Sequence, residues 1–155
     1  MNKSTIEEVL AKSKNSQIIL PLNLIGSSMK PLLREHKDTV LLSKPNGKLK
    51  KYDIALFKRK NGNYVLHRIV KTDNKQYFFC GDNQISLESG ITDDMIIAVT
   101  KGIYRGEKYI PCDRLSYKIY SRIWVTLLPL RRLNFRIKER FKIIIKKLKR
   151  NNCII

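Results

Sequence analysis

Between residues 18 and 100 the chain alternates short apolar runs with polar turns, and this pattern restricts it to a β-rich fold. The runs are rich in β-branched and aromatic residues, which favour strands. Lys60-Asn61-Gly62-Asn63 lies between two of them and is typical of a hairpin turn. The strands predicted from these runs are Ile18–Ile25, Thr39–Leu42, Ile54–Lys58, Tyr64–Val70, Tyr77–Cys80 and Met95–Thr100. Because their apolar alternation is imperfect, we expect a small antiparallel sheet that curls into a barrel-like domain.

The composition changes near residue 113. Residues 1–113 hold 19 basic and 12 acidic residues, whereas residues 114–155 hold 13 basic residues and one acidic residue. In this tail, apolar residues recur every three or four positions, which predicts an amphipathic helix. They are Ile123, Leu127, Leu130, Leu133, Ile137, Phe141, Ile144 and Leu148, with basic residues largely between them. Pro129 is expected to divide this segment into two helices or to kink one.

The basic tail indicates an anionic partner. The formal net charge of the chain is +19, and Trp124 lies near the start of the amphipathic segment. One interpretation is a peripheral anchor in which residues 114–150 lie on an anionic membrane surface. An equally weighted alternative packs the apolar face on the β domain and leaves the charges solvated. Nucleic-acid binding is a weaker alternative, because few aromatic residues are interleaved for stacking on bases.

The domain organisation follows from these patterns. We expect a short N-terminal helix at residues 1–15, a β-rich domain at 16–112 and a basic helical tail at 113–155. The start of the chain resembles neither a signal peptide nor a membrane span, because Pro21 and Asn23 interrupt its apolar run. The expected location is therefore peripheral on a membrane, or cytoplasmic.

Cysteine chemistry is not expected to carry the function. Cys80, Cys112 and Cys153 are odd in number and lack the C-x-x-C spacing of a zinc site or redox motif. We therefore expect free thiols, no metal ion and no cofactor.

Ser28 and His67 are the residues in the β-rich region best suited to catalysis. Ser28 lies in a small-residue turn, Gly26-Ser27-Ser28-Met29-Lys30-Pro31, directly after an apolar run. A serine is a weak nucleophile near neutral pH unless a base takes its proton. His67 lies in a predicted strand that would hold an imidazole in a fixed position, whereas His36 lies in a polar turn. By spacing alone, an ordinary turn and a structural histidine remain the more frequent interpretation.

Four separated segments, in this order, resemble the type I signal peptidases, a family of serine peptidases whose wider superfamily includes LexA-type repressors. Residues 26–33, Gly-Ser-Ser-Met-Lys-Pro-Leu-Leu, look like the nucleophile segment. Residues 51–57 are similar to the strand G-D-I-V-x-F, with Tyr52 where glycine is usual. Residues 65–70 look like the segment that carries the general base, and residues 80–83 resemble the G-D-N segment that closes the site.

The resemblance implies a role for individual residues. The base position holds histidine, as in the endoplasmic-reticulum and archaeal type of the family. In that type a carboxylate after the G-D-N segment completes the site, so either Asp82 or Glu88 is expected to orient His67. Glu88 stands where aspartate is usual.

The turn around the nucleophile is also given roles by the resemblance. Backbone N–H groups at the Gly26 turn are expected to stabilise an oxyanion, although Gly26 offers no side-chain donor. Met29, Pro31 and Asn83 are expected to line the substrate pocket or to support the site.

The expected function is a serine endopeptidase that cleaves a leader or signal-type peptide from a peptide or preprotein through an acyl-enzyme. Two alternatives remain open. One is a LexA-like self-cleaving regulatory protein, although only 27 residues precede Ser28 and a helix-turn-helix domain does not fit in them. The other is a catalytically idle relative that binds peptides or membranes.

Overall fold

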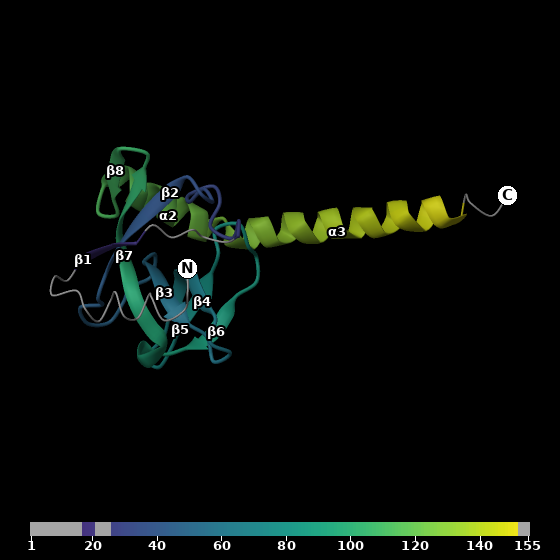
Figure 1. The fold of residues 1–155 in the computed structure, drawn as a ribbon. Helices are drawn as coiled ribbons and strands as arrows, with labels where there is room; N and C mark the ends of the chain where they lie inside the picture. Colours follow the sequence, from purple (N-terminus) through teal and green to yellow (C-terminus); the bar gives the residue numbers. More distant parts are fainter. Residues whose placement is uncertain (1–16, 21–25, 152–155) are drawn as a thin grey trace.

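The computed structural model describes residues 17–20 and 26–151 (Figure 1). The predicted N-terminal helix at 1–15 and the predicted strand residues 21–25 lie outside these ranges. Eight strands form one sheet: β1 (Gln17–Leu20), β2 (Asp38–Ser43), β3 (Ile54–Lys58), β4 (Tyr64–Thr72), β5 (Tyr77–Cys80), β6 (Glu88–Ile91), β7 (Ile96–Arg105) and β8 (Lys108–Pro111).

The sheet is antiparallel throughout. Its strand order is β1-β2-β7-β3-β4-β5-β6, and β8 pairs with the outer part of β7. The predicted hairpin joins β3 to β4, with Ala55 opposite His67. Register shifts interrupt the pairing of β2 with β7, β3 with β7, β4 with β5 and β5 with β6. Such bulges increase the local twist, so the sheet curls although β1 and β6, at its two ends, do not pair with each other. The prediction of a mainly β, antiparallel core is confirmed.

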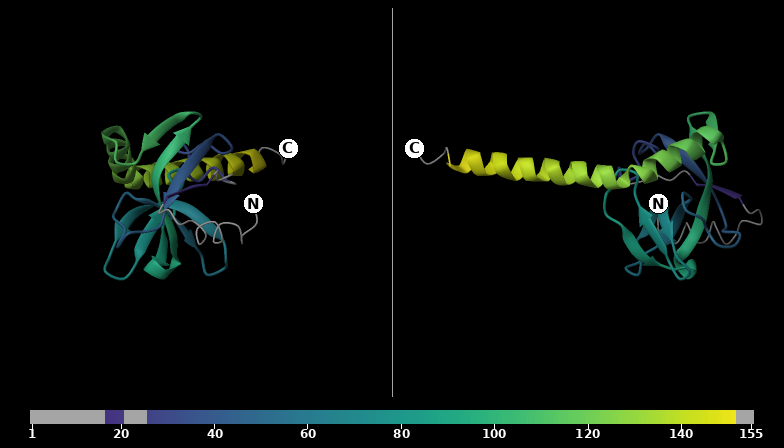
Figure 2. Two further views of the ribbon diagram at one scale, coloured as in Figure 1. Left: turned by 60° about the vertical axis from the view of Figure 1, so that its left-hand side comes forward. Right: turned by 180° about the vertical axis from the view of Figure 1, so that it is seen from behind.

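Two helices follow the sheet, as the periodicity of the tail predicts. α2 spans Leu115–Thr126 and α3 spans Leu128–Asn151, after a short 3₁₀ turn, η1 (Asp93–Met95), earlier in the chain. Pro129 lies in the first turn of α3, where the missing N–H costs no helical hydrogen bond. In the described part of the chain, neither helix combines the length and apolar character needed to cross a bilayer. α2 lies against the β domain, whereas α3 extends away from it (Figures 1 and 2).

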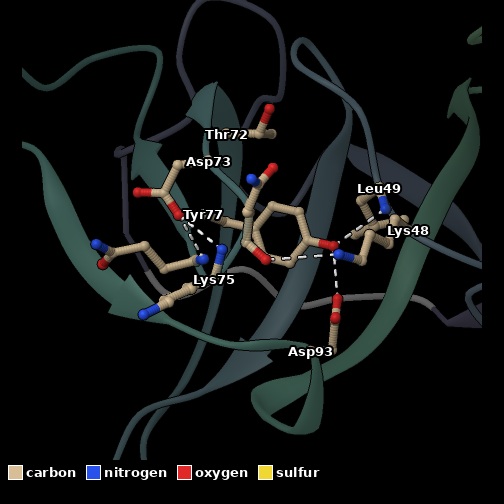
Figure 3. A pocket seen from close by; sticks show the side chains of 9 residues that line it. Lys48, Leu49, Thr72, Asp73, Lys75, Tyr77 and Asp93 are labelled. Atoms are coloured by element: carbon tan, nitrogen blue, oxygen red, sulfur yellow. Dashed lines mark hydrogen bonds between the residues drawn. The ribbon is translucent and has the colours of Figure 1, made fainter.

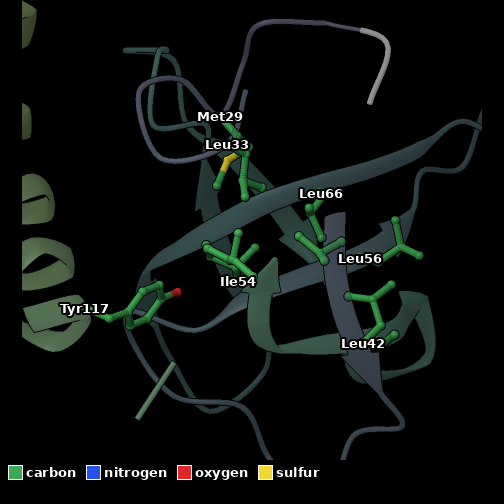
Figure 4. Packing of buried hydrophobic residues seen from close by; sticks show 10 residues of the cluster. Met29, Leu33, Leu42, Ile54, Leu56, Leu66 and Tyr117 are labelled. Atoms are coloured by element: carbon green, nitrogen blue, oxygen red, sulfur yellow. The ribbon is translucent and has the colours of Figure 1, made fainter. Parts of the chain in front are cut away.

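The curled sheet buries apolar side chains on both faces. Successive residues of β3 point to opposite sides, so Ile54 and Leu56 enter one cluster while Ala55 and Phe57 enter another. The first cluster also holds Met29 and Tyr117, and Figure 4 shows Tyr117 reaching into it from α2. This cluster therefore ties both the turn that carries Ser28 and the first helix of the tail to the sheet.

Tyr52 adopts a backbone angle φ of 85°, in the left-handed region that glycine favours. Its N–H donates to the Ile69 carbonyl at 2.8 Å, and its own carbonyl accepts from Arg68 at 3.1 Å. The backbone at Tyr52 thus explains in physical terms why a glycine suits this position.

Candidate functional site

Ser28 lies in a tight turn whose two sides are anchored in the molecule. The next residue, Met29, is buried in the core, and its carbonyl accepts the Leu33 N–H at 2.9 Å. The Ser28 carbonyl accepts the Asn83 N–H at 2.7 Å. Ser28 itself is partly exposed, and Pro31, three residues later in the same turn, is exposed. The backbone of the turn that carries Ser28 is therefore fixed, and Ser28 remains partly accessible to solvent.

His67 is held rigidly by its strand and its neighbours. Its side chain is 3% exposed, and its ring lies 6.4 Å from the Phe57 ring, edge to face. Burial lowers the pKa of His67, and the attraction to Glu88 offsets this only in part, so the pKa of His67 lies below the ordinary value for histidine. His67 therefore stays neutral, the form that accepts a proton, at lower pH than a free imidazole does.

Gly81 brings Ser28 and His67 to the same place. A Cβ atom built on Gly81 would lie 2.6 Å from the Ser28 carbonyl oxygen and 3.1 Å from His67 Nε2. A side chain at position 81 would therefore fill the space in which the serine turn meets the imidazole. Among the described residues, no hydrogen bond joins Ser28 Oγ to His67 Nε2. Catalytic hydrogen bonds are often long or absent without substrate and tighten when it binds.

Glu88 lies against the other nitrogen of the imidazole. Its Oε1 atom is 3.0 Å from His67 Nδ1, with the N–H direction bent away from a full hydrogen bond. Arg59 holds the same carboxylate with two hydrogen bonds of 2.6 Å. Burial raises the pKa of Glu88, but the hydrogen bonds from Arg59 and the neighbouring positive charge outweigh it and leave the pKa lowered. The carboxylate next to His67 is thus kept ionised.

Asp82 faces a different partner. Its two carboxylate oxygens each accept a hydrogen bond of 2.8 Å from Arg68, and both side chains are fully buried. Arg68 also donates to Ser121 Oγ at 2.7 Å, which links strand β4 to α2. Burial lowers the pKa of Arg68, but its pairing with Asp82 raises it more, so Arg68 keeps its positive charge. Of the two carboxylates proposed from the sequence, Glu88 contacts His67, and Asp82 is bound by Arg68 on the other face of β4.

The loop after Asp82 is bound by the helices. Trp124 Nε1 donates to the Asp82 carbonyl at 2.7 Å, and the Arg131 guanidinium donates to the same oxygen and to the Gln84 carbonyl. Arg132 donates to the Ile85 carbonyl at 2.8 Å. The junction of α2 and α3 therefore fixes the segment that leads to Glu88.

The amides of the serine turn differ in how they are used. The Gly26 N–H donates to Glu35 Oε1 at 2.9 Å, so this group, expected to face an oxyanion, is already engaged. Within the described residues, the N–H groups of Ser28 and Met29 have no acceptor. These two amides are the better candidates for oxyanion donors.

Sequence reasoning missed three contributors. Arg59 and Arg131 act across long sequence separations, and nothing in the local sequence marks them. Gly81 lies in the segment that resembles G-D-N, but its close approach to Ser28 depends on the fold. In residues 17–20 and 26–151 no group of three or more His, Cys, Asp or Glu side chains is arranged to hold a metal ion.

A separate hollow lies at the β4–β5 turn, at the far end of β5 from Gly81 (Figure 3). The buried Tyr77 hydroxyl accepts the Leu49 N–H at 3.2 Å and donates to Asp93 Oδ1 at 2.5 Å. Asp73 accepts two backbone N–H groups of the turn. The polar groups of Tyr77 and Asp73 in the hollow are therefore used to stabilise the surrounding turns.

Comparison with known proteins supplies no further guide to this site: no family model, curated protein or solved structure matches the chain.

Proposed function

We propose that this protein is a serine endopeptidase in which Ser28 is the nucleophile, His67 the general base and Glu88 the group that orients the base. The observation that carries the proposal is the meeting of the Ser28 turn with His67 Nε2 at Gly81, while Glu88 lies at Nδ1. A serine needs a neighbouring base, and the base needs a group that fixes its tautomer. The three side chains come from segments that are far apart in the sequence.

The reaction follows from these positions. His67 Nε2 takes the Ser28 proton as Oγ attacks the scissile carbonyl, and Glu88 stabilises the imidazolium that forms. The Ser28 and Met29 amides would donate to the oxyanion. His67 then protonates the leaving amine, which departs and leaves an acyl-enzyme on Ser28. Water, activated by His67, releases the acyl group and restores the serine.

The proposed family is the histidine-type signal peptidases, with the curled, barrel-like catalytic domain of the signal peptidase and LexA superfamily. Three of the four resembling segments meet at the site: the serine turn, the His67 strand and the segment around Gly81. The fourth holds Tyr52, whose positive φ suits the glycine usual there and whose carbonyl binds Arg68. This convergence is what supports the resemblance beyond the sequence.

The proposed substrate is an extended peptide or preprotein with a leader or signal-type segment. β6, which carries Glu88, lies at one end of the strand order. No other described strand pairs with its outer edge, so an extended chain could pair there beside the site, a recurring mode of peptide recognition.

Hydrolysis of a mixture of extended peptides, followed by mass spectrometry, tests the proposal. We expect cleavage by the native chain, and a loss of several orders of magnitude in Ser28→Ala and His67→Ala. Ser27→Ala is the matched control, because it removes an exposed neighbouring hydroxyl and should leave the rate unchanged. Cleavage of the chain itself, without cleavage of added peptides, would instead favour the LexA-like alternative. A folded protein that cleaves nothing would favour the catalytically idle relative.

A further inference from the structure

α2 presents two chemically different faces. The face toward the β domain is aromatic and polar: Tyr117 and Ser121 are buried, and Trp124 reaches the Asp82 carbonyl. The outer face is aliphatic and lies in solvent. Its residues are Leu115, Ile119, Ile123 and the C-cap residue Leu127, of which Leu115 is 71% exposed. The helix thus packs with its aromatic and polar side chains and leaves its aliphatic row uncovered, unlike an ordinary surface helix, which buries its aliphatic face.

The aliphatic row continues along α3. Leu130, Leu133, Ile137 and Phe141 are exposed, and each follows the previous one by three or four residues, so they lie on the same side as the row of α2. We call these eight residues of α2 and α3 the apolar stripe. α3 projects beyond the β domain, away from the rest of the described chain (Figure 1 and the right view of Figure 2). A contiguous exposed apolar stripe of this length indicates an interaction surface.

Basic side chains run along one edge of the stripe. Lys118, Arg122, Arg136 and Arg140 are exposed, and helical spacing places all four on the same flank. None of them pairs with an acidic residue in the described ranges. Arg131 differs, because it faces the β domain and binds carbonyl oxygens there. The free charges therefore border the apolar stripe, where a partner would meet both together.

We propose that the apolar stripe of α2 and α3 docks in the plane of an anionic lipid surface. An interfacial helix places apolar side chains at the level of the acyl chains and basic side chains among anionic headgroups. A second copy of the chain would bring two strongly positive segments together, since residues 114–155 hold 13 basic residues and one acidic residue. The proposal is independent of the peptidase activity proposed above.

Docking of the helices would also hold the β domain at the membrane surface. α2 is joined to the domain through Arg68, Ser121 and Tyr117, and the α2–α3 junction through Trp124 and Arg131. These contacts lie on the opposite side of α2 from the stripe. The membrane-facing and domain-facing sides of α2 can therefore be engaged at the same time.

Co-sedimentation of the full chain with vesicles tests the proposal. We expect binding to vesicles of phosphatidylcholine with phosphatidylserine, and at least tenfold weaker binding to phosphatidylcholine alone. Ile119→Ser with Ile123→Ser should weaken binding by roughly tenfold or more, because both side chains leave the acyl region. Leu87→Ser with Tyr109→Ser is the control, since it removes two exposed apolar side chains outside the stripe.

Charge is tested separately. Lys118→Gln with Arg122→Gln should weaken binding to anionic vesicles by roughly 10- to 30-fold. Lys37→Gln with Lys44→Gln removes the same charge from exposed positions on the β domain and should have a much smaller effect. Equal losses in the two pairs would mean that net charge alone is responsible, and would overturn the docking surface.

Two further readouts distinguish other occupants. Trp124, the single tryptophan, faces the β domain, so its emission should stay unchanged when vesicles bind; a marked blue shift would show that α2 leaves the domain and would overturn the proposed geometry. The native chain could instead fail to bind vesicles and form a dimer that Ile119→Ser with Ile123→Ser converts to a monomer. That result would overturn the proposal and show that the stripe binds a second copy of the chain. Tight binding to duplex DNA, with no binding to vesicles, would equally refute it.

Discussion

Gly81→Ala is the substitution that tests the geometry of the site most specifically. The added Cβ would lie 2.6 Å from the Ser28 carbonyl oxygen, below any distance that real Cβ atoms show. That oxygen belongs to backbone and also accepts the Asn83 N–H, so it cannot swing aside like the end of a side chain. The same Cβ would lie 3.1 Å from His67 Nε2. The serine turn and the imidazole must therefore move apart.

The expected effect on catalysis is large and the effect on folding moderate. Restoring an ordinary contact requires a displacement of close to 1 Å, and a misplacement of about 1 Å can lower a rate by about 10²-fold. Such a loss corresponds to about 2.7 kcal/mol of barrier. Overpacking should lower the free energy of unfolding by about 1–3 kcal/mol. The assay is the rate of acylation by a serine-reactive probe, measured beside urea denaturation.

Gly102→Ala is the matched control. Its Cβ would meet the ring of Tyr109, a partly exposed side chain on β8 that can turn away. We expect a similar or smaller loss of stability and an unchanged rate of acylation. A Gly81→Ala variant that is folded and reacts as fast as the native chain would refute the claim that Ser28 and His67 work across Gly81.

Three other predictions follow from the contacts around the site. Glu88→Gln should slow acylation by about 10²–10⁴-fold with little change in the urea midpoint, because the imidazole loses the carboxylate that orients it; an unchanged rate would remove Glu88 from the mechanism. Arg68→Met should lower the free energy of unfolding by about 3–5 kcal/mol, since it leaves the buried Asp82 unpaired, and adding Asp82→Asn should recover part of this loss in the same assay. The acylation rate should fall on acidification, because His67 gains a proton and can no longer act as the base. Burial lowers the pKa of His67, so the half-maximal rate should lie below about pH 6.5, the pKa of an unperturbed histidine. A pH–rate profile with its midpoint above that value would contradict the assignment.

The strands that local patterns predict best are those flanked by clear turn residues. Ile54–Lys58 and Tyr77–Cys80 coincide with β3 and β5, and the Asn61-Gly62 turn forms the expected hairpin. β6 was missed because Glu88-Ser89-Gly90-Ile91 has neither apolar alternation nor β-branched residues until its end. Such a strand forms because a neighbouring strand supplies its hydrogen-bond partners, and a single sequence does not reveal them.

The partners within the site depended even more on the fold. The sequence left both Asp82 and Glu88 as candidate partners of His67. Spacing along the chain does not show on which face of β4 each carboxylate lies. Arg59 binds Glu88 from 29 positions away in the sequence, and Arg68 binds Asp82 from 14 positions away. In the tail, periodicity predicted amphipathic helices, yet the side of α2 that packs on the domain is aromatic and polar. Periodicity identifies a face but not what covers it.

The most direct test of the central claim is the position of the covalent adduct that a serine-reactive acylating probe forms near neutral pH, located by peptide mass spectrometry. A single adduct on Ser28, absent in a folded His67→Ala variant, is the predicted result. An adduct on Ser27 or on another residue, or labelling of Ser28 that persists at the same rate without His67, would contradict a Ser28–His67 site.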